Sequence, residues 1–123
     1  MAKIQRFEDI QAWQKARVLT RTIYEVTNGK TKFGSDYGLK DQIRRASVSV
    51  MSNIAEGFAR RTDKDFGRFL YMALGSTAEV QSQLYVALDQ GYIVDIEFKD
   101  LYEAASETAR LITGFIQYLT AET

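Results

Sequence analysis

The sequence predicts an all-α fold: an antiparallel up-down-up-down four-helix bundle, with residues 1–123 as a single domain. Three observations lead to this prediction. The chain contains no proline, so nothing in it forces a long helix to end. Apolar residues recur every three or four positions in four segments, which is the spacing of one helix face. Short turns with helix-capping residues separate these segments, and short connections make consecutive helices antiparallel neighbours.

The first helix is predicted from about Glu8 to Thr27, and Asn28-Gly29 is expected to cap its C-terminus. Its apolar positions are Ile10, Trp13, Ala16, Leu19, Ile23 and Val26.

The second helix is expected to run from Ser35, as N-cap, to about Ala59, with Asp36 in its first turn. Its apolar face consists of Leu39, Ile43, Ala46, Val50 and Ile54.

The third helix is predicted to open with a capping box formed by Thr62 and Asp65 and to continue to about Gln90, where Gly91 ends it. The fourth begins at Asp95. Its apolar stripe comprises Phe98, Leu101, Tyr102, Ala105, Ala109, Ile112, Phe115, Ile116 and Leu119.

The third helix carries two apolar faces, and Glu79 is the only charged residue between positions 69 and 88. One face suits the core of its own chain: Phe66, Phe69, Leu70, Ala73, Val80, Leu84 and Ala87. A second face lies roughly 100° away: Tyr71, Leu74, Ala78, Tyr85 and Tyr92. Two apolar faces need two burial partners, so we expect these residues to form a contact between subunits of a homo-oligomer. Polar residues interrupt the segment too often for a membrane span.

A polar stripe runs along the second helix, flanked on both sides by apolar positions: Arg45, Ser49, Asn53 and Glu56. Across an antiparallel pair of helices it would face Ser76 and Glu79. We therefore expect a buried Arg45–Glu79 ion pair, satisfied by the neighbouring polar groups, that fixes the register of the helices. The competing interpretation makes Glu56 and Glu79 catalytic or metal-binding carboxylates, and the absence of His argues against its di-iron form.

The composition excludes most catalytic chemistry. The chain has no Cys and no His, so it lacks the usual zinc ligands, a thiol nucleophile and the commonest general base. We expect no enzymatic activity, no cofactor and no metal. The first residues lack the apolar run of a signal peptide, which predicts a cytoplasmic protein.

Charge is distributed unevenly along the chain. Residues 1–68 hold 14 Lys and Arg and 8 Asp and Glu, whereas residues 69–123 hold 2 and 8. Such asymmetry indicates either a face for a polyanion or oppositely charged helices that neutralise one another. The main candidate contacts with RNA are Arg60, Arg61, Lys64 and Arg68. Further cations on the first helix and the following loop are Arg17, Arg21, Lys30 and Lys32.

Several motifs recur together across nearly the whole chain: Phe7-Glu8-Asp9-Ile10 with Trp13, Tyr37-Gly38-Leu39, Gln42-Ile43-Arg44-Arg45-Ala46, Ser52-Asn53-Ile54-Ala55-Glu56-Gly57, Phe69-Leu70, and Gly75-Ser76 with Glu79. With these motifs the chain resembles the bacterial four-helix-bundle family encoded in intervening sequences of 23S ribosomal RNA genes. The resemblance implies ring-shaped pentamers, and a related branch comprises accessory proteins of diversity-generating retroelements. It also implies binding of RNA or protein without enzymatic activity, and architectural roles for Arg45, Asn53, Glu56 and Glu79.

The leading hypothesis is thus a non-enzymatic, oligomeric binding module whose partner is RNA or a ribonucleoprotein. The alternative is a protein–protein scaffold with no nucleic-acid role, using an acidic face on the fourth helix formed by Asp100, Glu103 and Glu107.

Overall fold

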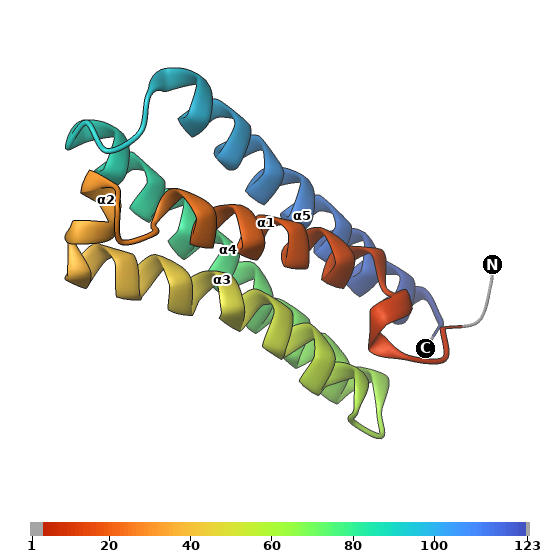
Figure 1. Ribbon diagram of the computed structural model, residues 1–123. Coiled ribbons are helices and arrows are strands. Elements are labelled where there is room, and N and C mark those ends of the chain that lie inside the picture. Colours follow the sequence, from red (N-terminus) through yellow and green to blue (C-terminus); the bar gives the residue numbers. More distant parts are fainter. Residues whose placement is uncertain (1–3, 123) are drawn as a thin grey trace.

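The computed structural model describes residues 4–122 of the chain, and within that range every regular element is a helix (Figure 1). In chain order the elements are η1 Phe7–Asp9, α1 Gln11–Val26, α2 Lys32–Ser35, α3 Tyr37–Phe58, α4 Asp63–Asp89 and α5 Asp95–Glu122.

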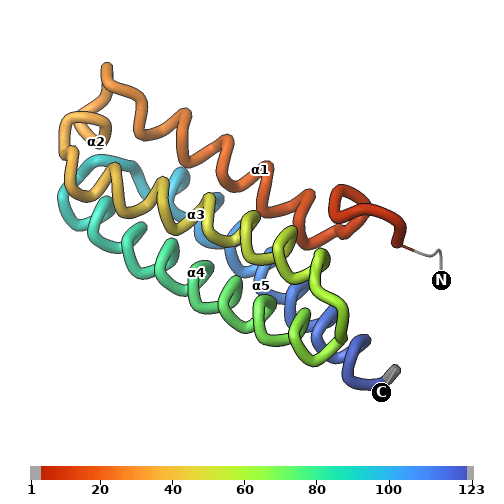
Figure 2. The backbone as a smooth tube through the Cα atoms, turned by 90° about the horizontal axis from the view of Figure 1, so that it is seen from below, coloured from red at the N-terminus to blue at the C-terminus, as the bar shows by residue number. Residues whose placement is uncertain are grey.

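The four long helices, α1, α3, α4 and α5, lie side by side, and each runs opposite to the long helix before it (Figures 1 and 2). Helix α3 packs against α1 and α4, while α5 packs against α4 and α1. Helices α1 and α4 therefore lie diagonally across from each other. The described ends of the chain lie at the same end of the molecule, beside the turn between α3 and α4.

The core follows the predicted apolar faces. All seven residues expected on the inner face of α4 are buried, as are all five expected on α3. They fall into two clusters along the helix axes. One contains Leu19, Ile43 and Leu84, and the other contains Val50, Leu70 and Ile112.

Two predicted helix boundaries are confirmed with their capping bonds. The Thr62 hydroxyl accepts a hydrogen bond from the Asp65 backbone N–H at 3.1 Å, which caps the N-terminus of α4. At the other end, Gly91 adopts a φ of 73°, the left-handed conformation that glycine adopts without steric cost. The Gly91 and Tyr92 N–H groups then bond the carbonyls of Leu88 and Ala87. This is a Schellman motif, and it ends α4 where expected.

The connection between α1 and α3 differs from the prediction. Ser35 is not the N-cap, because it ends the extra short helix α2, and Asp36 instead caps α3 by accepting from the Leu39 N–H at 3.1 Å. Phe33 of α2 is completely buried and anchors this segment in the core. Only glycine fits at position 34, because the Cβ of any other residue would lie 1.8 Å from the Asn28 carbonyl oxygen. Gly29 does not adopt the left-handed conformation expected of a helix cap.

Tyr92, expected on the subunit contact, packs against other parts of its own chain. Its ring stacks on Phe33 with centroids 5.6 Å apart, and its hydroxyl donates to Asp36 Oδ2 at 3.0 Å. The helical spacing that placed Tyr92 beside Tyr85 does not apply, because α4 ends at Asp89. Tyr92 therefore joins the end of α4 to the start of α3.

Helices α3 and α4 lie close together at Gly57, the last residue of the Ser-Asn-Ile-Ala-Glu-Gly motif. A Cβ on Gly57 would lie 2.8 Å from both the Phe69 Cβ and the Phe66 ring. The Phe69 Cβ is fixed to the backbone of α4 and cannot move away as a side-chain end can. The glycine therefore sets the separation of the two helices.

We expect Gly57→Ala to destabilise the fold by about 1–3 kcal/mol, because the added methyl group overpacks this contact. Urea denaturation followed by circular dichroism measures the change. The control is Gly67→Ala, where a Cβ meets nothing within 4 Å. There we expect unchanged or higher stability, since alanine favours helix more than glycine does. Equal stability of the two variants would contradict the packing argument.

A second prediction concerns Tyr92. The hydrogen bond to Asp36, reinforced by burial, raises the pKa of the Tyr92 hydroxyl above its ordinary value. The pKa of Tyr92 is therefore higher in the folded chain than in the unfolded chain. The bond contributes its full stabilisation below about pH 10, and that stabilisation is lost as the pH rises through the pKa of the folded state. We expect Tyr92→Phe to remove, from an ultraviolet pH titration, one tyrosine ionisation that lies above the ordinary tyrosine pKa. Asp36→Asn keeps a capping residue and should lower the Tyr92 pKa. An unchanged titration in either variant would contradict the assignment.

Candidate functional site

The four cations predicted to contact RNA gather at the turn between α3 and α4, but two of them are already engaged. Arg60 Nη2 lies 2.9 Å from Glu56 Oε1, and the Arg60 guanidinium lies 4.5 Å from the centre of the Phe69 ring. Arg68 Nε lies 3.8 Å from Asp65 Oδ1. Within residues 4–122, Arg61 and Lys64 form no ion pair. These two exposed side chains are the available cations of the turn.

Carboxylates reduce the positive potential of this turn. Glu56, Asp63 and Asp65 lie among the four cations, so the local excess of positive charge is small. Arg61 lines one shallow hollow of about 310 Å³, and Lys64 lines another of about 540 Å³. The turn can contact phosphate groups without reading a base sequence.

The polar stripe of α3 lies at the rim of the seam between α3 and α4, and the expected buried Arg45–Glu79 pair does not form. Arg45 is 80% exposed and its Nε pairs with Asp41 Oδ2 at 2.8 Å. Glu79 is exposed as well. A long arginine side chain reaches water from this rim, so it avoids the desolvation cost of a buried pair. The prediction of a buried pair is therefore wrong, although both residues line the same hollow.

The shorter polar residues do bridge the two helices. The hydroxyls of Ser49 and Ser76 lie 2.9 Å apart, and Asn53 Nδ2 donates to the Ser49 carbonyl at 2.9 Å and to its hydroxyl at 3.0 Å. Glu56 pairs with Arg60, which follows the C-cap of α3. Next to these groups, Gln83 Oε1 is buried without a hydrogen-bond partner. It adjoins the hollow of about 370 Å³ that Arg45 and Glu79 line.

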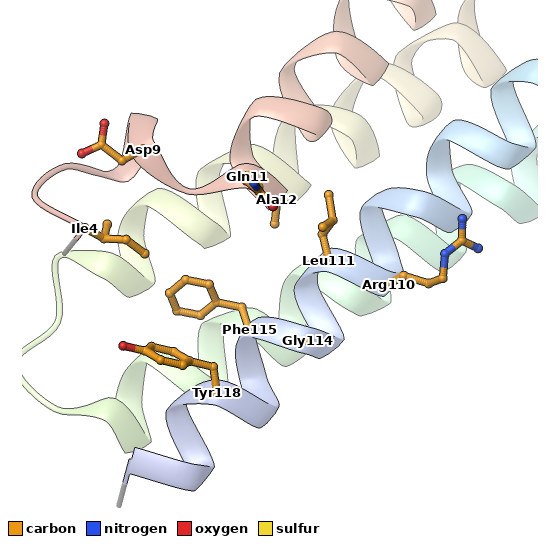
Figure 3. Close-up of a pocket in the computed structure, with 9 residues that line it drawn as sticks. All are labelled: Ile4, Asp9, Gln11, Ala12, Arg110, Leu111, Gly114, Phe115 and Tyr118. Atoms are coloured by element: carbon orange, nitrogen blue, oxygen red, sulfur yellow. The ribbon is translucent and has the colours of Figure 1, made fainter. Parts of the chain in front are cut away.

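A cavity of about 440 Å³ lies where residues 4–12 meet α5 (Figure 3). Its walls are mostly apolar, and Phe115 and Tyr118 extend towards Ile4. Its two charged residues are engaged elsewhere. Asp9 Oδ2 accepts from the backbone N–H groups of Gln5 and Arg6, and Arg110 pairs with Glu103.

Across residues 4–122, no group of three or more Asp and Glu side chains is placed to hold a metal ion. None of the helices in that range has the length and apolar character that a membrane crossing requires.

The outward face of α4 is exposed and largely apolar. Tyr71 is 63% and Tyr85 49% exposed, and Ala78 lies between them. Leu74 is half-buried and packs against the core of its own chain. Two further exposed residues of this face were missed at positions adjacent to the predicted ones: Met72 and Val86. The helix thus combines a buried face with an exposed one that contains few charges.

The acidic face predicted on α5 is mostly engaged. Glu103 pairs with Arg110 at 2.9 Å, and Glu107 pairs with Lys15 of α1 at 3.4 Å. Asp100 is exposed and forms no ion pair within the described residues.

Sequence reasoning also missed two cations on α3, Lys40 and Arg44. They share a face with Arg17 and Arg21 of α1. The available signal was the four-residue spacing in both pairs, one on each of two adjacent helices.

Comparisons with known proteins agree with this all-helical architecture. A search of the curated proteins found no significant match. Among solved structures, the crystal structure of a protein of unknown function from the S23 ribosomal protein family of Bacteroides thetaiotaomicron is similar, with a TM-score of 0.79. The two chains are 20% identical, and the match covers 85% of this chain and 97% of the other. The model of the 23S rRNA-intervening sequence protein family matches residues 8–114, and the chain belongs to that family.

Proposed function

We propose that this chain is a non-enzymatic four-helix-bundle subunit of a ring-shaped homo-oligomer that contacts RNA or a ribonucleoprotein. We propose that the ring is a pentamer, on the strength of the family resemblance. The observation that carries the proposal is the exposed, nearly uncharged face of α4, which a second copy of the chain would cover.

The composition of this face favours a subunit contact. Tyrosine and methionine are enriched in protein interfaces, and Tyr71, Met72 and Tyr85 are all exposed here. Between them the face carries small residues, Gly75 and Ala78, that let another helix approach closely. Contiguous apolar surface of this kind marks an interaction site.

Arg61 and Lys64 support a contact with RNA because, among the described residues, no carboxylate pairs with either of them. Two cations on one subunit bind a polyanion weakly. In a ring of identical subunits the same pair repeats, and simultaneous contacts raise the overall affinity. A protein scaffold that uses the acidic face of α5 is less well supported, because Glu103 and Glu107 are paired within the chain.

We expect Gly75→Arg to block assembly, because a charged side chain would project from the centre of the α4 face. Sedimentation velocity at micromolar concentration measures the result: a multimer of the 14.0 kDa chain for the wild type and a monomer for the variant.

The matched control for assembly is Gly114→Arg. Gly114 is also exposed within a long helix, and a Cβ at either glycine meets nothing within 4 Å. This control should assemble like the wild type. A monomeric wild type, or the same sedimentation for both variants, would overturn the proposed interface.

For RNA binding, we expect the double variant Arg61→Gln/Lys64→Gln to weaken binding of single-stranded RNA. The logarithm of the association constant should also depend less steeply on the logarithm of salt concentration, by about 0.7 for each phosphate that the variant no longer neutralises. Fluorescence anisotropy titrations at several salt concentrations measure both. Lys99→Gln, an exposed cation of α5, should leave binding unchanged. A wild type that binds no RNA would overturn the proposal.

A further inference from the structure

We infer that the face shared by α1 and α3 is a second and larger surface for single-stranded nucleic acid, formed by Arg17, Arg21, Lys40 and Arg44 with Tyr37 as a stacking platform. The inference rests on the proposed function only in taking nucleic acid as the partner. The inferred surface uses different residues from the contact proposed at the turn between α3 and α4, so an experiment can overturn either one without the other.

The antiparallel packing of α1 and α3 brings these cations onto one surface. Arg17 and Arg21 are four residues apart on α1, and Lys40 and Arg44 are four residues apart on α3. Within each pair, the two residues are therefore separated by about 6 Å along the helix axis. Two hydrogen bonds fix the register of the helices. Thr20 Oγ1 donates to the Ser47 carbonyl at 3.1 Å, and Arg44 Nη2 donates to the Tyr24 carbonyl at 3.3 Å. Helices α1 and α3 lie side by side (Figure 2), so this register places the cations along the α1–α3 seam.

None of these four cations forms an ion pair within residues 4–122. Residues 11–48 contain eight Lys and Arg but only three Asp and Glu. Two of the three carboxylates are engaged elsewhere: Asp36 accepts from Tyr92 and the Leu39 N–H, and Asp41 pairs with Arg45. Only Glu25 remains to offset the cations. This segment is thus more positive, and less neutralised, than the turn between α3 and α4.

The positive charge of α1 and α3 is also not cancelled by the acidic half of the chain. Residues 69–123 carry the excess of carboxylates, yet within the described residues a single ion pair, Lys15–Glu107, joins two different long helices. The remaining pairs lie within one helix or at its cap. Apart from that one pair, the described cations of α1 and α3 are therefore not neutralised by carboxylates of α4 or α5, and such unneutralised positive charge attracts a polyanion.

Aromatic rings accompany the cations along the seam. The Arg44 guanidinium lies 4.1 Å from the centre of the Tyr24 ring, and Arg17 lies 5.9 Å from the Trp13 ring. Tyr37, at the first turn of α3, is 77% exposed and has Lys40 beside it. Cationic grooves with exposed aromatic rings bind single strands, because phosphates meet the cations while bases stack on the rings. This combination favours a single strand over a duplex, whose bases are already stacked.

Arg44 has a different role from the other cations. Its Nε donates to the Thr27 hydroxyl at 2.8 Å, and its Nη2 donates to the Thr27 carbonyl at 3.1 Å. Arg44 thereby caps the C-terminus of α1, so its removal would disturb the fold. Arg17 and Arg21 are exposed within α1, away from its ends, which makes them the residues to change.

The test compares two double variants that each remove two positive charges: Arg17→Gln/Arg21→Gln on α1 and Arg61→Gln/Lys64→Gln at the turn. The probe is a fluorescein-labelled single-stranded RNA of about 20 uridines, a few times longer than the shortest single-strand sites, titrated at low salt. We expect the α1 variant to lose about tenfold or more in affinity, and more than the turn variant. Tyr37→Ala should lose about fivefold or more. Circular dichroism and sedimentation confirm that each variant folds and assembles as the wild type does.

Each outcome either supports or overturns the inference. A decrease of less than about twofold in the α1 variant, while the turn variant decreases more, overturns this inference and leaves the proposed function standing. A wild type that binds no RNA removes both. Weaker binding in the α1 variant together with a change in its sedimentation shows that the face contacts the acidic side of another copy, which also overturns the inference. Reduced affinity with unchanged assembly supports it.

Discussion

The contact on which the rest of this structure depends is the close approach of α3 to α4 at Gly57. Phe66 and Phe69 of α4 occupy the space where any other residue would place a Cβ. Because the contact lies beside the turn that joins the two helices, it fixes their spacing at the start of a long seam. Further along that seam Ser49 and Ser76 come within 2.9 Å of each other. Serine side chains are short, so their hydroxyls can bridge two helices only when the two backbones already lie close together.

The same close spacing explains where the polar stripe lies. A seam narrow enough for a contact between two serines has no room for an arginine and a glutamate between the helices. Arg45 and Glu79 are therefore displaced to the rim, where water solvates both charges. The buried pair that the sequence suggested would have required a wider seam and the desolvation of two ions. The neutral part of the network remains between the helices. It consists of Ser49, Asn53 and Ser76, whose side chains form hydrogen bonds with one another.

Helical periodicity and caps were sufficient to predict the core, because burial follows from spacing within one helix. Leu70, Val80 and Leu84 were assigned correctly on that basis, and Thr62 and Gly91 marked the ends of α4. Prediction failed wherever a residue lies outside a regular helix or has a long side chain. Tyr92 follows a left-handed turn that resets the helical angle, and α2 is too short to have a period. Arg45 and Arg60 each pair with a carboxylate four residues earlier in the chain rather than with one on α4, and side-chain geometry decides which partner is taken. Placing Lys40 and Arg44 on one surface with Arg17 and Arg21 required the register and rotation of the two helices, which their packing fixes.

The order of the helices around the molecule separates the two proposed surfaces. Helix α1 packs against α3 and α5, the same two helices that flank α4. The outward face of α4 and the cationic face along α1 therefore point in different directions. A second copy could cover Tyr71, Ala78 and Tyr85 without covering Arg17 or Arg21. In a closed ring, the α4 face of each subunit meets a different surface of the next subunit; if that surface lies away from α1, the cationic faces repeat around the assembly. Electrostatic attraction at such a repeated surface grows with the number of subunits, so assembly would strengthen the binding of a long single strand.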